Sequence, residues 1–480
     1  MRIFVSNTVN RADVGFRSER GPILIALMLT TGLVAIDATI LATAVSSIVD
    51  DLGDFRLFPW LFSIYLLAQA VSVPIYAKLS DVVGRKPIIL IGIALFMVGS
   101  ILCGFAWSMP ALIAFRVVQG LGAGAVQPMS VTIAGDIYTL AERAKTQGYL
   151  ASVWGISSVV GPTLGGLFSQ FLSWRWIFFV NVPLCLIAAF MIYRTFHETI
   201  TPRRHKVDYL GAGLLAAALS LLILAVLEGG QAWAWNSWQS IGAFAVGAVL
   251  LGLFVVAESR AAEPILPLWV FSRRLLLTTS LISLGGGAIL IGLTSYVPTY
   301  LERTLDTPPL IAGLALATLT IGWPIAAANS GRLYLRFGFR NTVLIGLAFI
   351  LLGSSALAAS ALTPTLWFVA LSCFVIGLGM GLMITPSLIA AQSSVEWDER
   401  GVVTGTNLFA RSIGSAVGVA IFGAIANAIF LAAGTETDPG VVASASSAVF
   451  IAVLVAAVAT VVAAVAMPRR ERSTSVTFPS

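Results

Sequence analysis

Long apolar stretches with almost no charged residues recur along all 480 residues of this chain. Only 10% of the residues are charged, whereas soluble domains carry about 25%, so the polar surface is too small to cover a body in water. In lipid every backbone N–H and C=O needs an internal partner, which leaves helical bundles and closed barrels. The stretches exceed roughly 18 residues and do not alternate as barrel strands of about ten residues do. They therefore predict an all-α integral membrane protein.

Charged and turn residues divide the sequence into fourteen predicted membrane spans. These spans cover residues 21–48, 57–77, 87–106, 110–136, 146–170, 174–193, 208–227, 239–257, 275–300, 309–331, 341–360, 365–388, 402–431 and 441–467. With the N-terminus inside, three of the 28 Lys and Arg fall in outer segments (Arg56, Arg175 and Arg303) and two within spans (Arg116 and Arg411), which leaves 28 − 3 − 2 = 23 inside. This asymmetry satisfies the positive-inside rule. We therefore predict a multi-pass protein of the cell inner (plasma) membrane with both termini cytoplasmic.

An internal repeat relates two halves of the chain. Residues 77–86 (AKLSDVVGRK) align without gaps with residues 331–340 (GRLYLRFGFR), and residues 120–124 (GLGAG) match 377–381 (GLGMG). Two similar six-helix halves with two inserted helices explain both offsets, and duplicated halves around a central site are typical of alternating-access transporters. The predicted organisation is a cytoplasmic tail (1–20), an N-terminal bundle (21–194), two inserted helices with flanking loops (195–274), a C-terminal bundle (275–467) and a cytoplasmic tail (468–480).

Several other functional classes lack support in the sequence. The three cysteines lie in separate apolar spans, and the two histidines, His197 and His205, share one loop, so neither a disulfide framework nor a metal site is predicted. The segments between spans contain no nucleophile–base pair and no phosphate-binding loop, which argues against an enzyme and against a cofactor. Basic residues are spread among short loops rather than gathered in one patch, which favours membrane orientation over nucleic-acid binding.

Four motifs resemble those of the major facilitator superfamily. Residues 77–86 resemble its loop motif, with Ala77 in place of the first glycine, and residues 36–39 resemble the first-helix acidic motif of the fourteen-helix branch. Residues 116–124 resemble the fourth-helix motif associated with proton transfer, and residues 155–166 resemble the fifth-helix signature of exporters. With all four in order, the chain resembles the fourteen-helix drug:proton antiporters over nearly its whole length. The resemblance implies the major facilitator fold and multidrug efflux.

Asp37 is the only acidic residue deep within a predicted span, where a charge costs at least about 2.5–3.5 kcal/mol. At about 1.5 Å per residue it lies roughly 22 Å above the cytoplasmic face, and Arg116 reaches about the same depth from the outer end of its span. The two side chains can therefore meet. We interpret Asp37 as the proton-coupling site, because a change of exposure shifts a carboxyl pKa; the alternative is a permanent ion pair that fixes helix packing. Arg116 either tunes this site or only holds its span in place.

A second group of charges, Asp81, Arg85 and Asp136, is predicted at the cytoplasmic face, where spans two and four both end. The resemblance implies that these charges form a cytoplasmic gate, which holds the halves together in the outward-facing state and separates when that side opens. Gly84 permits a tight turn beside Arg85 and Lys86, which a simple charge anchor would not need. The alternative is that Arg85 and Lys86 only set membrane orientation.

Glycine and proline are concentrated in the fifth predicted span, at Gly155, Gly161, Pro162, Gly165 and Gly166. Glycine lets helices approach closely, and proline frees a backbone carbonyl and bends its helix. We interpret these residues as a packed bend that shapes the transport path and limits leak. General packing of membrane helices is the alternative.

Five further residues are candidates for lining the transport cavity: Gln119, Gln127, Trp154, Trp323 and Arg411. The two tryptophans lie mid-span rather than at a membrane interface, so they either stack on substrate or serve packing. Arg411 lies about 13 Å from the predicted cytoplasmic face, a depth from which its side chain can reach back toward water. The alternative role for Arg411 is to bind an anionic group.

Together these features predict an antiporter that exports small amphiphilic molecules from the cytoplasm or inner leaflet in exchange for protons. Because the chain has one deep acid, neutral or monocationic substrates are favoured over dications. The predicted partners are the substrate, protons and membrane lipids, and the chain is expected to work as a monomer. The alternatives are an exporter of a lipid or specific metabolite and a proton-coupled nutrient importer, although the fifth-span signature argues against the importer.

Overall fold

The structure is a computed structural model that describes residues 14–41, 44–53, 59–198, 208–229, 233–261, 264, 268–360, 365–434 and 438–469. Within these ranges the regular elements are helices, and short segments connect them. One isolated β-bridge pairs Gly229 with Trp233. The predicted all-α class is therefore confirmed for the described part of the chain. Most of the two predicted cytoplasmic tails lies outside the described residues.

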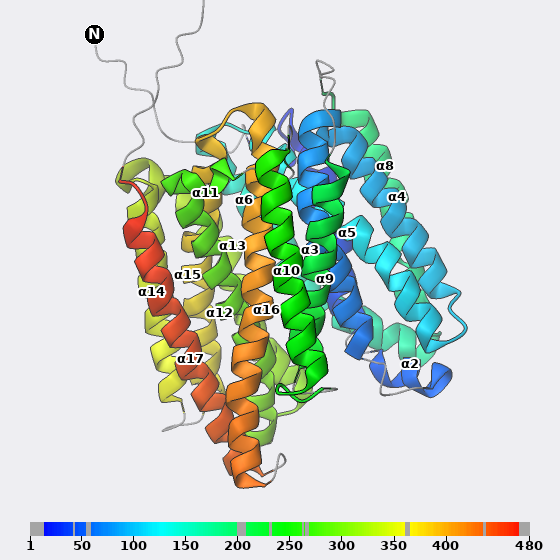
Figure 1. The fold of residues 1–480 in the computed structure, drawn as a ribbon, viewed down its shortest axis with the longest axis vertical. Coiled ribbons are helices and arrows are strands. Elements are labelled where there is room, and N and C mark those ends of the chain that lie inside the picture. The colour runs from blue at the N-terminus through cyan, green and yellow to red at the C-terminus, as the bar shows by residue number, and fades with distance from the viewer. Residues whose placement is uncertain are drawn as a thin grey trace, which may run out of the picture.

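Long helices stand side by side along most of the bundle (Figure 1). The first set comprises α1 (Gly21–Ile40), α2 (Val45–Leu52), α3 (Pro59–Val83), α4 (Arg85–Gly104), α5 (Met109–Ile137), α6 (Leu140–Phe171), α7 (Trp176–Phe179) and α8 (Asn181–Thr195). Next come α9 (Tyr209–Glu228), α10 (Trp238–Arg260) and the short α11 (Trp269–Ser272). The last set comprises α12 (Arg274–Thr304), α13 (Pro309–Phe337), α14 (Phe339–Ala359), α15 (Leu366–Ser393), the 3-10 turn η3 (Trp397–Glu399), α16 (Arg400–Ala433) and α17 (Pro439–Ala466).

Twelve helices in the described ranges are long and apolar enough to cross a membrane. Two other long helices, α9 and α16, contain shorter apolar segments, Leu210–Leu222 and Ile421–Phe430. Since only helices and closed barrels satisfy their backbone in lipid, these apolar helices make the chain a multi-pass membrane protein. The count of fourteen spans stays a prediction, because α9 and α16 do not meet the same criterion over their described residues.

The predicted first span, residues 21–48, is two helices rather than one. α1 ends at Ile40, and α2 begins separately at Val45. The short α2 is amphipathic, because Ile48 is buried while Asp50 is exposed, so it suits the rim of the bundle better than its apolar middle. Figure 1 shows α2 at the end of the bundle opposite the one where α17 ends.

Two glycines each turn the chain between long helices. Gly84 separates α3 from α4, and Gly338 separates α13 from α14, at equivalent places in the internal repeat. Their φ angles are 104° and 82°, in a region that glycine adopts without the steric cost of a side chain. A tight turn thus lies at Gly84, but α3 runs to Val83 and passes the predicted end of its span at residue 77.

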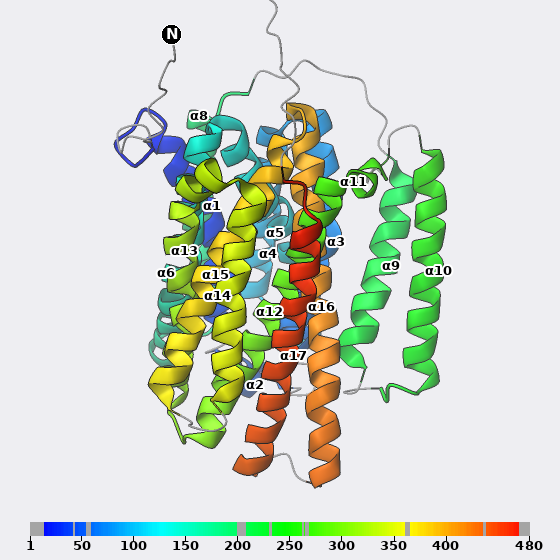
Figure 2. The same ribbon diagram turned by 90° about the vertical axis from the view of Figure 1, so that its left-hand side faces the viewer.

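Buried apolar side chains form separate cores in the two parts of the chain. One core draws on residues 23–196 and the other on residues 275–467. The two parts meet where α6 contacts α13 and α3 contacts α16. α9 and α10 pair with each other at one edge of the molecule (Figure 2), where α9 contacts both α3 and α16. This layout suits the internal repeat, while the domain boundaries themselves stay a prediction.

A polar contact ties α2 to the residues before α7. Arg175 Nη1 lies 2.7 Å from Asp51 Oδ2, and Trp174 Nε1 donates to the same oxygen over 3.0 Å. The hydrogen bond from Arg175, followed by that from Trp174, lowers the pKa of Asp51 below its ordinary value of 3.8. Because the folded-state pKa is depressed, the contact stabilises the fold above that ordinary value and weakens as the pH falls through the folded value. Both side chains are partly exposed, so the contribution is small.

Candidate functional site

A buried ion pair joins α1 to α5. Arg116 Nη1 lies 2.6 Å from Asp37 Oδ2, and each side chain is 1% exposed. The two residues that the sequence places at one depth therefore meet. A pair of opposite charges this close and this dry is held strongly only if the remaining polar atoms also find partners.

Hydrogen bonds from two amides complete the surroundings of the Asp37 carboxylate. Its Oδ1 accepts from Gln119 Nε2 at 2.7 Å and from Asn181 Nδ2 at 3.2 Å, and both amides also donate to Ser100 Oγ. Gln119 is thus a fully buried member of this network rather than a residue that lines a cavity. Asn181 escaped prediction, although it is the only asparagine between residues 21 and 194 and so carried a usable signal.

The guanidinium of Arg116 is held from α3 as well. Its Nε donates to the carbonyl oxygen of Leu61 over 3.2 Å, and its Cζ lies 4.1 Å from the centre of the Tyr65 ring. Side chains from α1, α3, α4, α5 and α8 therefore surround one ion pair and seal it from water. In this conformation a proton can reach Asp37 only if some of these helices move apart.

A cluster of charges lies at the end of the bundle where α1 begins and α17 ends, which we call the termini face (Figure 1). The fully buried Arg85 lies 2.8 Å from Asp81 (Nη2 to Oδ1) and 3.2 Å from Asp136 (Nε to Oδ2). Its guanidinium also stacks on the ring of Trp397, 3.6 Å from the ring centre. The three charged residues predicted to form one group are therefore together.

Residues from the second half of the chain complete this group. Asp81 accepts hydrogen bonds from the backbone N–H groups of Gly401 and Val402, at 3.1 and 2.8 Å. Arg400 Nη1 lies 3.0 Å from Asp136 Oδ1. A carboxylate is stabilised at a helix N-terminus by the free N–H groups and by the helix dipole. The termini-face cluster (Asp81, Arg85, Asp136, Trp397 and Arg400) thus joins α3, α4 and α5 to the start of α16.

Lys86 lies outside this cluster. Its Nζ donates to the carbonyl oxygen of Tyr193 over 2.8 Å and lies 5.0 Å from the centre of that ring, within the first half of the chain. Glu198 accepts from the backbone N–H groups of Arg85 and Lys86, at 3.1 and 3.0 Å, and so caps the start of α4. Two adjacent basic residues therefore have different surroundings, since only Arg85 contacts the second half.

Further contacts close the termini face between the halves. Arg143 Nη1 donates to Ser393 Oγ over 3.1 Å, which joins α6 to α15. The Tyr334 hydroxyl donates to the carbonyl oxygen of Leu140, which joins α13 to α6. In this conformation these bonds and the termini-face cluster together hold the two halves against each other at the termini face.

The predicted glycines of α6 differ in what they touch. A Cβ added to Gly155 would lie 2.9 Å from the Thr320 carbonyl oxygen on α13, and one added to Gly161 would lie 2.0 Å from Thr39 Oγ1 on α1. A Cβ at Gly166 would meet no atom within 4 Å. Gly165 is buried, and the side chain of Pro162 lies outside the described residues. Two of the glycines thus permit close helix contacts, and one does not.

Replacing Gly161 by alanine is expected to lower the melting temperature of the purified protein. The new methyl group would collide with Thr39, whose hydroxyl is already held by the Ser157 carbonyl oxygen at 2.9 Å, and such overpacking costs about 1–3 kcal/mol. Gly166→Ala is the matched control on the same helix and is expected to leave the melting temperature unchanged or slightly higher. Equal shifts in the two variants would show that the predicted bend has no specific packing at Gly161.

The remaining candidate cavity residues have unequal surroundings. Gln127 accepts from Gln69 Nε2 over 2.8 Å, and this amide pair is only partly buried. Trp154 and Trp323 pack against the apolar cores of the first and second halves. Arg411 is partly buried, and within the described part of the chain it has no ion pair and no hydrogen bond from its side chain.

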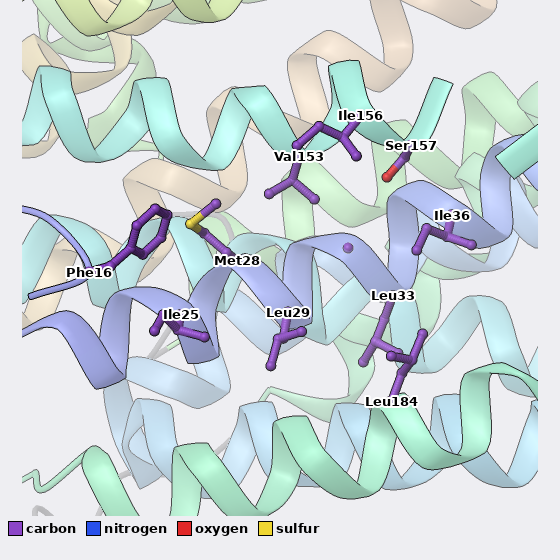
Figure 3. Close-up of a pocket in the computed structure, with 11 residues that line it drawn as sticks. Phe16, Ile25, Met28, Leu29, Leu33, Ile36, Val153, Ile156, Ser157 and Leu184 are labelled. Carbon is purple, nitrogen blue, oxygen red and sulfur yellow. The ribbon is translucent and has the colours of Figure 1, made fainter. Parts of the chain in front are cut away.

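An apolar groove of about 280 Å³ lies among α1, α6 and α8. Figure 3 shows Phe16 at one end of the groove, near the start of α1, and Ile36 toward the other end. Ile156 on its wall is 59% exposed, so the groove opens on the outside of the bundle. Its lining is almost entirely hydrocarbon, with Ser157 as a polar exception.

The comparisons with known proteins agree with this architecture. A family model described as Major Facilitator Superfamily matches residues 27–419. Multidrug resistance protein 3 of Bacillus subtilis (strain 168) is 36% identical over 427 residues, which cover 88% of this chain and 83% of that protein. Multidrug transporter protein MdtP of the same organism is 34% identical over 419 residues, which cover 86% and 76%.

Solved structures show the same fold at low sequence identity. The human organic anion transporter MFSD10 superposes with a TM-score of 0.64 at 15% identity, over 92% of this chain and 99% of that one. The proton:xylose symporter XylE superposes with a TM-score of 0.62 at 13% identity, over 90% and 94%. The chain belongs to the major facilitator superfamily. It is accordingly a transporter rather than an enzyme.

Proposed function

We propose that this transporter is a proton-coupled antiporter that exports small amphiphilic, drug-like molecules by alternating access. The observation that carries the proposal is the buried pair of Asp37 and Arg116, held within one half of a protein whose termini face is closed by charges from both halves. The relatives named as multidrug transporters, at 36% and 34% identity, support drugs as the substrate class.

The coupling follows from the costs of buried charge. A proton that binds Asp37 neutralises the carboxylate, so the Arg116 guanidinium loses its counter-ion and the conformation that buries both is destabilised. The two bundles are then expected to rotate to their other arrangement, in which the termini face is open and the opposite face is closed. One proton that moves down a 100 mV potential supplies about 2.3 kcal/mol, which supports useful export at a stoichiometry of one.

The proposed setting is the plasma membrane, with the termini face in the cytoplasm. The 23 basic residues that the sequence analysis places in inner segments support this orientation. We expect one chain to be sufficient for transport, with lipids surrounding the apolar exterior. The groove beside α1 opens on the outside of the bundle and reaches the termini face at Phe16, which supports access from the inner leaflet as well as from the cytoplasm.

Everted membrane vesicles that contain the full chain would test this function. A fluorescent amphiphilic dye is expected to accumulate when the vesicle lumen is acid and to leak out when an uncoupler is added. Accumulation that ignores the uncoupler would overturn proton coupling. Movement of substrate together with protons would identify an importer, and uptake of labelled phospholipid in place of dyes would identify a lipid exporter.

A further inference from the structure

Arg411 lies deep in α16 without a counter-charge among the described residues. It lies eleven positions beyond the start of the helix at Arg400, about 16 Å from the termini-face cluster at 1.5 Å per residue, in a hydrocarbon core of about 30 Å. An unpaired charge at such a depth is costly and usually faces a bundle interior or a water-filled space. The other deep charges among the described residues, Asp37 and Arg116, neutralise each other, so within this part of the chain Arg411 adds one uncompensated positive charge to the interior.

The neighbours of Arg411 along α16 show which way it faces. Gly414 lies against the Leu284 carbonyl oxygen on α12, while Gly405 lies against Ala77 on α3. Phe409 belongs to an apolar cluster that includes side chains of α9. At about 100° per residue, Arg411 points roughly 160° away from Phe409. It therefore faces away from α9 and toward α12, whose Gly287 lies against the Arg411 carbonyl oxygen, with α3 on the adjacent side of α16.

The register between α16 and α3 gives the level of Arg411. A Cβ added to Gly401 would lie 2.8 Å from the Ala77 carbonyl oxygen, and one added to Gly405 would lie 2.3 Å from the Ala77 Cβ atom. Arg411 is six residues beyond Gly405, about 9 Å along the helix axis. Because the two helices run in opposite directions, this level corresponds to residues 69–71 on α3.

Gln69 lies at that level on α3 and donates to Gln127 of α5. Gln127 takes part in this bond through its Oε1 oxygen, so the bond uses none of the N–H donors of the Gln127 amide, and it uses one of the two on Gln69. Both amides and Arg411 are partly buried rather than sealed. A guanidinium with amide donors at the same height is the arrangement that binds an oxyanion, because charged hydrogen bonds to such groups are short and strong.

We propose that Arg411, assisted by Gln69 and Gln127, binds the anionic headgroup of an amphiphilic substrate such as a sulfonate or carboxylate. This site rests on the proposed export function and narrows its substrate class. It also revises the preference for neutral or monocationic substrates, because that preference counted Asp37 as a free acid, whereas Asp37 is paired with Arg116. An anion leaving and a proton entering both carry charge in the direction that an inside-negative potential favours.

Binding to the purified full chain in lipid nanodiscs would test the site. Decyl sulfonate, decanol and decyltrimethylammonium share one alkyl chain and differ in headgroup charge, and empty nanodiscs give the background. We expect the wild type to bind decyl sulfonate about tenfold more tightly than decanol. Arg411→Gln is expected to remove that preference without changing decanol binding, and Arg411→Lys to keep most of it. A wild type that prefers the ammonium, or an Arg411→Gln variant that keeps the preference, would overturn the proposal.

Two controls separate this site from a structural role and from the transport mechanism. Arg332→Gln, an exposed arginine of α13, is expected to bind all three probes as the wild type does. The melting temperature of Arg411→Gln is expected to equal or exceed that of the wild type, because an unpaired charge is removed; a clear fall would show a structural role instead. Equilibrium binding needs no proton gradient, so a wild type without a preference for decyl sulfonate would contradict this site alone, and uncoupler-insensitive export would contradict the antiport alone.

Discussion

Replacing Arg85 by glutamine is expected to open the termini face and to raise the labelling rate of a cysteine introduced by Ser80→Cys, at a fully buried position beside Gly401 of the second half, on the order of 100-fold. Arg85 is fully buried and pairs with both Asp81 and Asp136. Removing one partner from a buried charge group costs about 3–5 kcal/mol, and this cost falls only on the conformation in which that face is closed. Everted vesicles and a membrane-impermeant maleimide would measure the rate, since the three native cysteines are buried.

Lys86→Gln is the matched control for this experiment. Lys86 is adjacent to Arg85 and carries the same charge, but its side chain contacts Tyr193 within the first half alone. We expect its labelling rate to stay within about twofold of the wild type, because these contacts do not join the two halves. The two variants lose the same charge, so the positive-inside count cannot explain a difference between them. If both variants behaved alike, Arg85 would serve membrane orientation and not closure of the termini face.

Asp37→Asn is expected to reduce proton-driven uptake of a fluorescent amphiphile into everted vesicles to the background seen with an uncoupler. Asparagine does not ionise and so cannot bind and release a proton, and it leaves the guanidinium of Arg116 without the counter-ion that lies at 2.6 Å. The loss of a buried partner costs about 3–5 kcal/mol, so the melting temperature is expected to fall as well. Uptake and stability are therefore both measured.

The double variant Asp37→Asn with Arg116→Gln distinguishes coupling from packing. It is neutral at both positions, so it removes the unpaired charge and is expected to recover much of the melting temperature lost in Asp37→Asn. Proton-driven uptake is expected to stay at background, because no titratable group remains in the pair. Restored uptake at the wild-type rate would show that the ion pair only holds α1 to α5.

The sequence predicted features that depend on position along a helix axis. The rise of about 1.5 Å per residue placed Asp37 and Arg116 at one depth, and they form an ion pair. The ends of α3 and α5 at a common face brought Asp81 and Asp136 to Arg85. Scarcity of charge defined the all-α membrane class, since lipid leaves the backbone few alternatives.

Two kinds of feature were not predictable in this way. One depends on which side of a helix faces its neighbours, and the other on contacts between residues distant in the chain. Asn181 reaches Asp37 from a helix 144 positions along the chain, and Arg400 reaches Asp136 from 264 positions away. Gly161 and Gly166 look alike in sequence, yet only Gly161 presses against a neighbouring helix. A single sequence gives hydrophobic pattern and depth, and tertiary contacts decide which face of each helix is occupied.

The pair of helices α9 and α10 stands beside the seam where the two halves meet. Its contact with that seam is made of hydrocarbon, in a cluster that joins α3, α9, α10 and α16 and includes Leu67, Leu219 and Phe409. Such a contact has no directional bonds to break, so it resists separation but tolerates sliding. We therefore expect the proposed rocking of the two halves to pivot at this flank, so that the largest displacement occurs at the opposite flank, between α6 and α13.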